Sequence, residues 1–187
     1  MTFKNQISIT ADSGVGSTTT SRRFIEHMGI SPWRWVNAGA IMRELAKERG
    51  MSIDEFNAYS LSHPEEKVDE LCDNMIRHFA EQDYAVFEGR LVHHFAPDAF
   101  HVLLVCPPEV RAKRRAKDFP NMTEKEIFDK IKIRDAINRE RYKKIYGEGV
   151  LWEEDRFDLV LDTHEFTPEE VVGKIIDRHK EWLEQSK

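Results

Sequence analysis

A short β-branched segment near the N-terminus runs directly into a loop of small residues, and the loop runs into a helical pattern. The segment is Gln6 to Thr10 (QISIT), and the loop ADSGVGST follows it. Alternation and β-branching predict a strand for the segment. A strand that passes through a glycine-bearing loop into a helix is typical of strand–helix–strand units. The chain is therefore expected to build a parallel sheet with helices.

The rest of the chain continues this alternation of strands and helices. Further strands are expected to end at 36–37 and to cover 84–88, 101–106 and 157–161. Helices are expected at 39–49, from a capping box at Ser52, at 64–81, 109–118 and 123–146, and from Thr167 to about 183. Five strands linked in this way predict an α/β fold whose parallel sheet is covered on both faces, with ligands at the carboxyl ends of the strands.

Length and composition favour one globular domain spanning residues 1–187. Apolar residues make up 40% of the chain and charged residues 33%, and no apolar run approaches the roughly 20 residues of a membrane helix. The first residues are too few and too polar for a secretion signal. Cys72 and Cys106 have no metal-like spacing, and the neighbouring His93 and His94 are expected on a loop surface. A cytoplasmic protein with reduced thiols is the expectation, without a membrane partner.

The loop after the first strand has the spacing of a phosphate-binding loop. The motif G-x-x-x-x-G-K-[ST] aligns with Ala11 to Thr18, with Ala11 at the first glycine and Ser17 at the lysine. Gly14 and Gly16 would let the backbone turn its amides towards phosphate oxygens, and the helix start adds its positive dipole. The Thr18 hydroxyl is placed to coordinate Mg²⁺. An ordinary strand–helix turn remains the alternative for this segment.

Arginines follow the strands and crowd one basic segment. Between residues 111 and 144 there are thirteen Lys and Arg against six Asp and Glu, a local charge of +7 in a chain of net charge −6. A localised basic segment in an acidic chain predicts an anionic ligand, and guanidinium groups bind phosphate bidentately. The candidates are Arg43, Arg90, Arg111, Arg114, Arg115, Arg134 and Arg141. Glu88, at the end of a strand, could hold Mg²⁺ through water.

These residues together resemble the archaeal-type cytidylate kinases, a branch of the nucleoside monophosphate kinases within the P-loop kinases. The resemblance covers nearly the whole chain, in order and spacing. Its segments are the loop with Gly14, Gly16 and Ser17 to Thr19, the run 37–52, Glu88 to Leu91, Pro108 to Arg114, Arg141 to Gly147 and Phe157 to Thr163.

The resemblance implies a three-layer P-loop kinase fold with a five-stranded parallel sheet, a helical insert for the monophosphate at about 38–80 and a helical lid at about 111–146. It implies transfer of a phosphoryl group from ATP, with Mg²⁺, to CMP or dCMP, in one in-line step. ATP would lie on the loop, which comprises Ala11, Asp12, Ser13, Gly14, Val15, Gly16, Ser17, Thr18 and Thr19.

The remaining roles are also carried over from the resemblance. Arg43 and Arg90, with Gly39 and Gly89, would hold the acceptor, while Asp69 and Asp73 match acidic positions, one of which would read the cytosine amino group. Glu88 would sit at the magnesium end. The lid arginines would be Arg111 or Arg115 together with Arg134 and Arg141.

Several positions depart from the family pattern. Ala11 and Ala40 replace a glycine and a glutamate, Ser17 stands where the family commonly has threonine, and Cys72, Met75 and Ile76 occupy positions after the acidic residues. Two alternatives therefore stay open, a kinase for another small acceptor and a catalytically weak nucleotide-binding module. RNA binding through 111–144 is disfavoured because Tyr142 and Tyr146 are better explained by helix packing than by contacts with bases. A monomer that binds no nucleic acid is expected.

Overall fold

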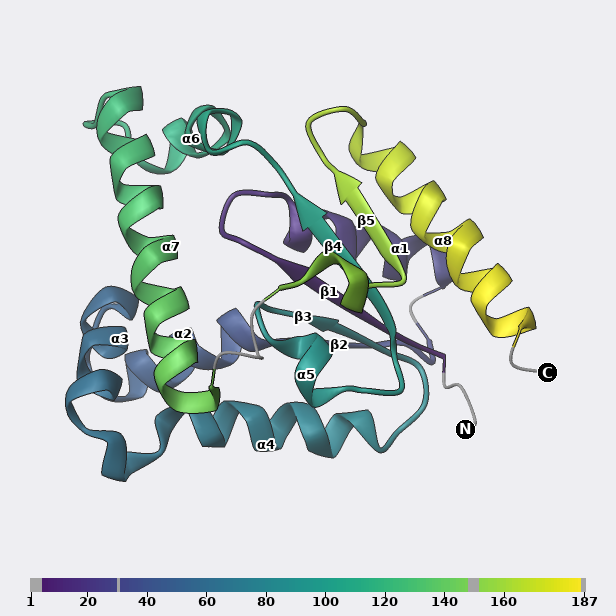
Figure 1. Cartoon of the computed structure of the whole chain (residues 1–187), viewed down its shortest axis with the longest axis horizontal. Coiled ribbons are helices and arrows are strands. Elements are labelled where there is room, and N and C mark those ends of the chain that lie inside the picture. Colours follow the sequence, from purple (N-terminus) through teal and green to yellow (C-terminus); the bar gives the residue numbers. More distant parts are fainter. Residues whose placement is uncertain (1–4, 30, 148–151, 186–187) are drawn as a thin grey trace.

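Five parallel strands form one sheet in the order β2-β3-β1-β4-β5 (Figure 1). The computed structural model describes residues 5–29, 31–147 and 152–185. The strands are β1 Gln6–Ala11, β2 Arg34–Asn37, β3 Ala85–Glu88, β4 Phe100–Val105 and β5 Leu159–Asp162. Every strand that the sequence predicts is present, and the parallel α/β fold is confirmed.

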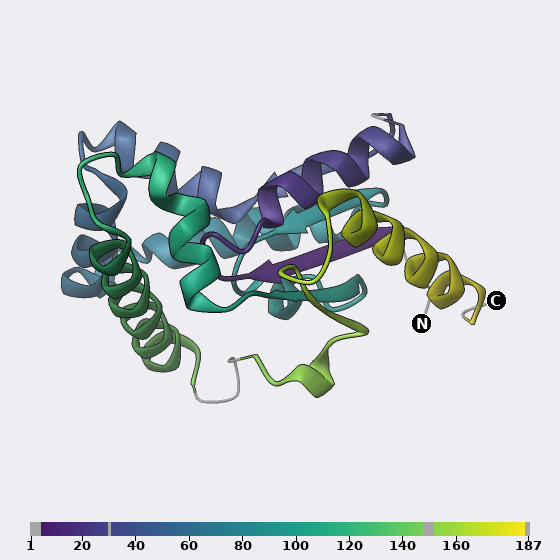
Figure 2. The same ribbon diagram turned by 90° about the horizontal axis from the view of Figure 1, so that it is seen from above.

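Helices lie on both faces of the sheet, which gives three layers (Figure 2). They are α1 Ser17–Met28, α2 Ala38–Glu48, α3 Ile53–Ser62, α4 Val68–Ala80, α5 Val92–Phe95, α6 Pro108–Arg115, α7 Glu124–Tyr146 and α8 Pro168–Glu184, with short 3₁₀ turns at Pro64–Glu66, Ala116–Asp118 and Glu154–Arg156.

The sheet divides the core into two apolar clusters because successive strand residues point to opposite faces. In β3, Val86 packs with residues of α1 and α8, whereas Phe87 packs with residues of α2, α4 and α5. Both side chains are fully buried. Parallel strands covered in this way read as continuous apolar runs, which is how β3 and β4 appear in the sequence.

The central strand β1 is buried on both faces although three of its side chains are polar. Gln6, Ser8 and Thr10 are each 0% exposed, so each needs a hydrogen-bond partner. Ser8 Oγ lies 2.7 Å from His101 Nδ1, and Thr10 Oγ1 lies 3.2 Å from His93 Nδ1. The expectation of a loop surface for His93 is wrong, because this ring is buried in α5 beneath the sheet.

Local signals fixed most helix starts, with one exception between α3 and α4. Capping boxes open α3 at Ser52, α7 at Thr123 and α8 at Thr167, three positions where helix starts were predicted. The single helix expected over 64–81 is wrong. A 3₁₀ turn covers Pro64–Glu66, and Lys67 adopts the left-handed conformation with φ 49° before α4 begins.

Helices α6 and α7 form a hairpin beyond the carboxyl ends of the strands, with α7 lying beside α3 (Figure 1). Ala112 of α6 packs against Ile127 and Ile131 of α7 in a small core of their own. The hairpin and the α2–α4 segment stand on two sides of the loop that follows β1.

Across the described ranges, none of the helices combines the length and apolarity of a membrane span.

Candidate active site

The loop that follows β1 has the backbone that anion binding requires. Gly14 and Gly16 have φ of 85° and 114°, a region that glycine adopts at little cost. Gly16 occupies the N-cap position of α1 without a side-chain cap, which leaves the first-turn amides of that helix available to an anion. Ala11 lies inside β1 as an ordinary strand residue. Its replacement of the motif's first glycine therefore imposes no backbone strain.

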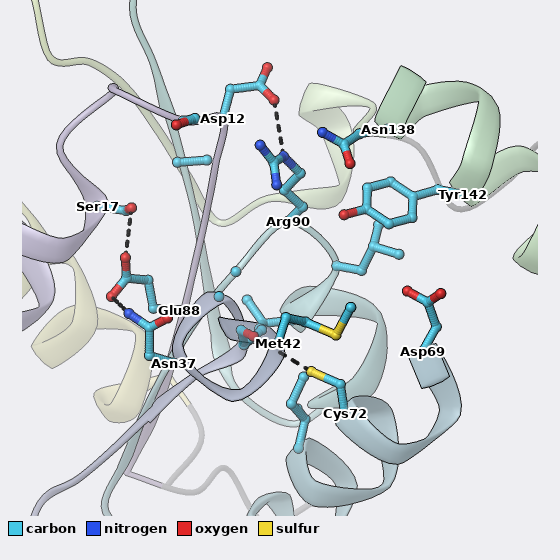
Figure 3. Close-up of a pocket in the computed structure, with 18 of the residues that line it drawn as sticks. Asp12, Ser17, Asn37, Met42, Asp69, Cys72, Glu88, Arg90, Asn138 and Tyr142 are labelled. Carbon is cyan, nitrogen blue, oxygen red and sulfur yellow. Dashed lines mark hydrogen bonds and ion pairs between the residues drawn. The ribbon is translucent and has the colours of Figure 1, made fainter. Parts of the chain in front are cut away.

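Glu88 lies directly against this loop. Its Oε1 accepts hydrogen bonds from Ser17 Oγ at 2.8 Å and from Thr18 Oγ1 at 2.6 Å. Its Oε2 accepts from Trp35 Nε1 at 3.1 Å and from Asn37 Nδ2 at 2.6 Å. Only 5% of the residue is exposed. The carboxylate is thus fixed from both sides, with one oxygen turned towards the loop hydroxyls (Figure 3).

The oxygens of Glu88 and Thr18 suit a hard divalent cation such as Mg²⁺, which prefers oxygen ligands and keeps several waters. Among the described residues, no group of three or more His, Cys, Asp or Glu could hold a metal ion by itself. A cation here would therefore depend on one hydroxyl, one carboxylate, water and the phosphates of a nucleotide. That is the usual situation for magnesium in phosphoryl-transfer sites.

Three arginines of α6 donate hydrogen bonds to oxygens of the loop. Arg111 Nε donates to Ser13 O at 2.8 Å, Arg114 Nη1 donates to Val15 O at 2.9 Å, and Arg115 Nη1 donates to Ser13 Oγ at 2.6 Å. Arg114 also binds both oxygens of Thr163, at 2.9 and 2.7 Å. The shared helix face was predicted, but these guanidinium groups contact the loop itself.

A cleft opens in front of the loop, between α2, α4 and α7 (Figure 3). The predicted site residues that line it are Ala11, Asp12, Ser13, Gly14, Ser17, Thr18, Gly39, Arg43, Asp69, Asp73, Glu88, Gly89, Arg90, Arg134 and Arg141. Those outside the lining are Val15, Gly16, Thr19, Arg111 and Arg115. The structure therefore brings most of the predicted residues to one place, from segments far apart in the sequence.

Three of the cleft arginines have a buried nitrogen that makes no hydrogen bond to a described residue. These are Nη2 of Arg90, Nε of Arg134 and Nε of Arg141. Burial, together with the nearby Arg90 and Arg115, lowers the pKa of Arg134. Arg43 lies in the second turn of α2, and its Nη1 would be 3.3 Å from a Cβ placed on Gly39. Unpaired guanidinium nitrogens in a cleft are suited to a phosphate.

Residues of α4 connect to α7 across the far end of the cleft. Arg141 Nη2 lies 3.3 Å from Asp69 Oδ1, and Tyr146 Oη donates to Asp73 Oδ2 at 2.6 Å. Burial raises the pKa of Asp73 to about 6, and burial also raises the pKa of Asp69. In this structure both acidic residues bind α7, Asp69 through Arg141 and Asp73 through Tyr146, and Arg141 also binds Asn57 of α3.

Sequence reasoning missed several contributors to the site, among them Asn57 and Tyr146 described above. Trp35 and Asn37 bind Glu88, while Asn138 and Tyr142 of α7 line the cleft. A usable signal existed for Asn37, because a polar residue that ends a strand beside Glu88 falls at the same sheet edge. The helix residues carried no comparable signal, since their positions depend on how α7 packs.

Comparisons with known proteins agree with this geometry. The model of the family described as "Cytidylate kinase-like family" matches residues 6–165. The cytidylate kinase of Pyrococcus horikoshii is 36% identical over 166 residues, covering 88% of this chain and 83% of that protein. The cytidylate kinase of Methanopyrus kandleri is 36% identical over 168 residues, with 84% and 83% covered.

Solved structures support the fold alone. The shikimate kinase of Bacteroides thetaiotaomicron superposes with a TM-score of 0.60 at 18% identity, covering 96% of this chain and 98% of that chain. A gluconokinase of Sinorhizobium meliloti superposes with a TM-score of 0.56 at 13% identity, covering 99% and 97%. The arrangement of the sheet and loop is thus that of P-loop kinases.

Proposed function

This chain belongs to the cytidylate kinase-like family, and we propose that it transfers the γ-phosphoryl group of ATP to CMP or dCMP. The single observation that carries the proposal is the cleft. It combines an uncapped helix start after a glycine loop with guanidinium nitrogens of Arg90, Arg134 and Arg141 that no described residue binds. The loop suits the phosphates of a donor nucleotide, and the arginines suit the phosphate of an acceptor.

The proposed roles follow the position of each residue. The backbone of the loop from Ala11 to Thr19 holds the ATP phosphates, Arg43 and Arg90 hold the acceptor phosphate beside Gly39 and Gly89, and Arg134 stabilises the charge of the migrating group. Bound Mg²⁺ would neutralise phosphate charge at Thr18 and Glu88. Transfer is direct and in line, with no covalent intermediate on the enzyme.

In this proposal, the two helical segments around the cleft close over the bound substrates. Residues 38–80 form the insert that receives the monophosphate, and residues 111–146 form the lid, with Arg141 inside it. Arg111 and Arg115 already bind the loop, so we assign them a share in shaping it for the donor phosphates. Closure would exclude water, which protects ATP from hydrolysis.

The proposal extends to the setting of the enzyme. We infer a cytoplasmic monomer that uses small-molecule substrates and binds neither nucleic acid nor membrane. The net charge of −6 supports the exclusion of nucleic acid, and the two free thiols of Cys72 and Cys106 support a reducing compartment. Asp69 or Asp73 is the proposed reader of the base.

A coupled assay of ADP release over CMP, dCMP, UMP, AMP and GMP tests this function. ADP release should depend on CMP or dCMP and should require Mg²⁺. Arg90→Ala and Arg134→Ala should each lower turnover by at least about 100-fold, the scale of losing one transition-state donor. Lys113→Ala, on the exposed face of α6, is the matched control and should retain turnover.

Two other outcomes would replace the proposal. ADP release with a sugar or another alcohol, and none with CMP, would identify a kinase for a different acceptor. Tight ATP binding without acceptor-dependent ADP release would identify a nucleotide-binding module. Wild-type turnover in both arginine variants would contradict the assigned roles.

A further inference from the structure

Two strand ends lie side by side at the base of the cleft, and one side chain joins them. Asn37 ends β2 and Glu88 ends β3, and the two residues are register partners in the parallel ladder. Asn37 Nδ2 donates to Glu88 Oε2 at 2.6 Å (Figure 3). The link therefore runs between neighbouring strand ends and not along one of them.

The oxygen of the same side-chain amide contacts a different element, helix α2. Asn37 is the N-cap of α2, and its Oδ1 accepts a hydrogen bond from the backbone amide of Ala40 at 2.8 Å. Helix α2 is the element that carries Gly39 and Arg43 along the cleft. One side chain thus contacts both the carboxylate at the loop and the start of the helix at the acceptor side.

The backbones of these two segments also meet without space between them. A Cβ placed on Gly89 would lie 2.7 Å from the Cβ of Ala38. Real Cβ atoms do not approach so closely, so residues 37–39 and 88–90 are packed as one unit. Movement of either segment is therefore expected to move the other.

We propose that Asn37 is a positioning residue with two separable actions. Its side-chain amide nitrogen holds Glu88 in the orientation that the proposed Mg²⁺ position requires. Its side-chain amide oxygen holds the first turn of α2, the helix that faces the acceptor. This inference rests on the proposed function. Trp35 binds the same Oε2 at 3.1 Å, whereas the side-chain cap of α2 in the described part of the chain comes from Asn37. Trp35 therefore shares only the first action of Asn37, the contact with Glu88.

Serine and alanine separate the two actions at position 37. Asn37→Ser keeps a hydroxyl that can cap α2 but is too short to reach Glu88. Asn37→Ala removes both contacts. Trp35→Phe removes one donor to Glu88 and leaves the cap intact. Thr167→Ala removes the N-cap of α8, remote from the cleft, and is the matched control for losing a cap.

Two readouts distinguish the actions. Asn37→Ser should weaken calorimetric ATP binding about tenfold in Mg²⁺, and less than twofold in EDTA, because partners behind a metal ligand typically change affinity 10–100-fold. Its KM for CMP should stay within about twofold of wild type. Asn37→Ala should show the same Mg²⁺-dependent loss, a KM for CMP raised roughly tenfold, and a Tm about 2–4 °C below Asn37→Ser, as expected for a lost cap.

The controls make each result decisive. Trp35→Phe should share the Mg²⁺-dependent loss at a smaller size, and Thr167→Ala should lower Tm while ATP binding and KM stay at wild-type values. Wild-type Mg²⁺-dependent ATP binding in Asn37→Ser would overturn the first action, and equal KM values for the serine and alanine variants would overturn the second. A wild-type enzyme that releases no ADP with any monophosphate would refute the proposed function instead, while the calorimetric comparison would still test the link to Glu88.

Discussion

Arg90 and Asp12, which follow the neighbouring strands β3 and β1, form an ion pair with Nε of the arginine 3.5 Å from Oδ1 of the aspartate (Figure 3). The second carboxylate oxygen of Asp12 lies 3.8 Å from Nη1 of Arg111. Burial raises the pKa of Asp12, and the nearby Asp135 raises it further. A carboxylate is thus kept inside a cleft that we assign to phosphates, and it competes with them for the same arginines.

Asp12→Asn should tighten the binding of the acceptor. The long contacts to Asp12 constrain the orientation of Arg90 weakly, so the main effect of the carboxylate is its charge. A like charge about 8 Å from a phosphate at an effective dielectric near 40 contributes ~1 kcal/mol of repulsion. The KM for CMP is expected to fall roughly fivefold, as measured by initial rates at saturating ATP.

The opposite result would assign a different role to Asp12. A raised KM for CMP in Asp12→Asn would mean that the aspartate orients Arg90, and that orientation outweighs charge repulsion. Asp118→Asn removes a carboxylate that pairs with Arg115 away from the cleft lining, and it serves as the charge-matched control.

Arg114→Ala should impair the donor site through the shape of the loop. The side chain ties Val15 O to Thr163, and its removal leaves these oxygens without their charged donor. Hydrogen bonds to charged groups contribute about 1.5–3 kcal/mol each, so the KM for ATP should rise at least tenfold. Initial rates at saturating CMP measure this, with the neighbouring Lys113→Ala as control. Equal effects on KM for ATP in the two variants would exclude a specific role of Arg114.

Gly89→Ala should destabilise the protein although alanine is usually the better residue in regular structure. The added Cβ would lie 2.7 Å from Ala38 Cβ and 3.1 Å from Val92 Cγ1, so the backbone must shift. The expected cost is about 1–3 kcal/mol in the free energy of unfolding. Gly173→Ala in α8 has no atom within 4 Å of its new Cβ and should stabilise by about 0.5–1 kcal/mol. Urea unfolding of both variants tests the pair, and a stabilised Gly89→Ala would contradict the packing.

Asp73→Asn should stabilise the protein at pH 8 and have little effect at pH 4. Burial raises the pKa of Asp73 to about 6 from 3.8, so between these values the folded chain keeps a proton that the unfolded chain has lost. The wild type therefore loses stability as pH rises through this window. The neutral amide can still accept the hydrogen bond from Tyr146. The variant is expected to gain roughly 1–3 kcal/mol at pH 8.

Chemical unfolding at the two pH values measures this difference directly. Because every other titratable group is unchanged in the variant, its titration cancels in the comparison. A stability difference that is the same at pH 4 and pH 8 would show that the carboxylate does not titrate in this window.

Local chemistry explains which parts of the fold could be predicted. Capping boxes at Ser52, Thr123 and Thr167 involve residues three apart, so the sequence contains the whole signal. Glu88 was predictable as a site residue because the carboxyl ends of parallel strands meet at one edge. The glycine loop was predictable because its positive φ values need glycine at Gly14 and Gly16.

Other features depend on contacts between distant residues. Arg111 and Arg114 meet the loop over separations of 98 and 99 residues, so their face was predictable but their partners were not. His93 is buried where its ring meets Thr10 of the central strand, 83 residues away in the chain. The left-handed Lys67 interrupts a helical pattern without glycine or proline at that position, and no local rule indicates such a break.

The position of β1 in the middle of the sheet has a consequence during synthesis on the ribosome. Both of its neighbours, β3 and β4, come from residues 85–105, so the first strand to emerge waits until about half of the chain has been made before it is paired. Pairing between distant segments is slow and leaves both edges of this strand unpaired in the meantime. The nascent chain therefore gains a nucleotide-competent loop only after its second half has begun to appear, and until then QISIT is a segment for chaperones to shield.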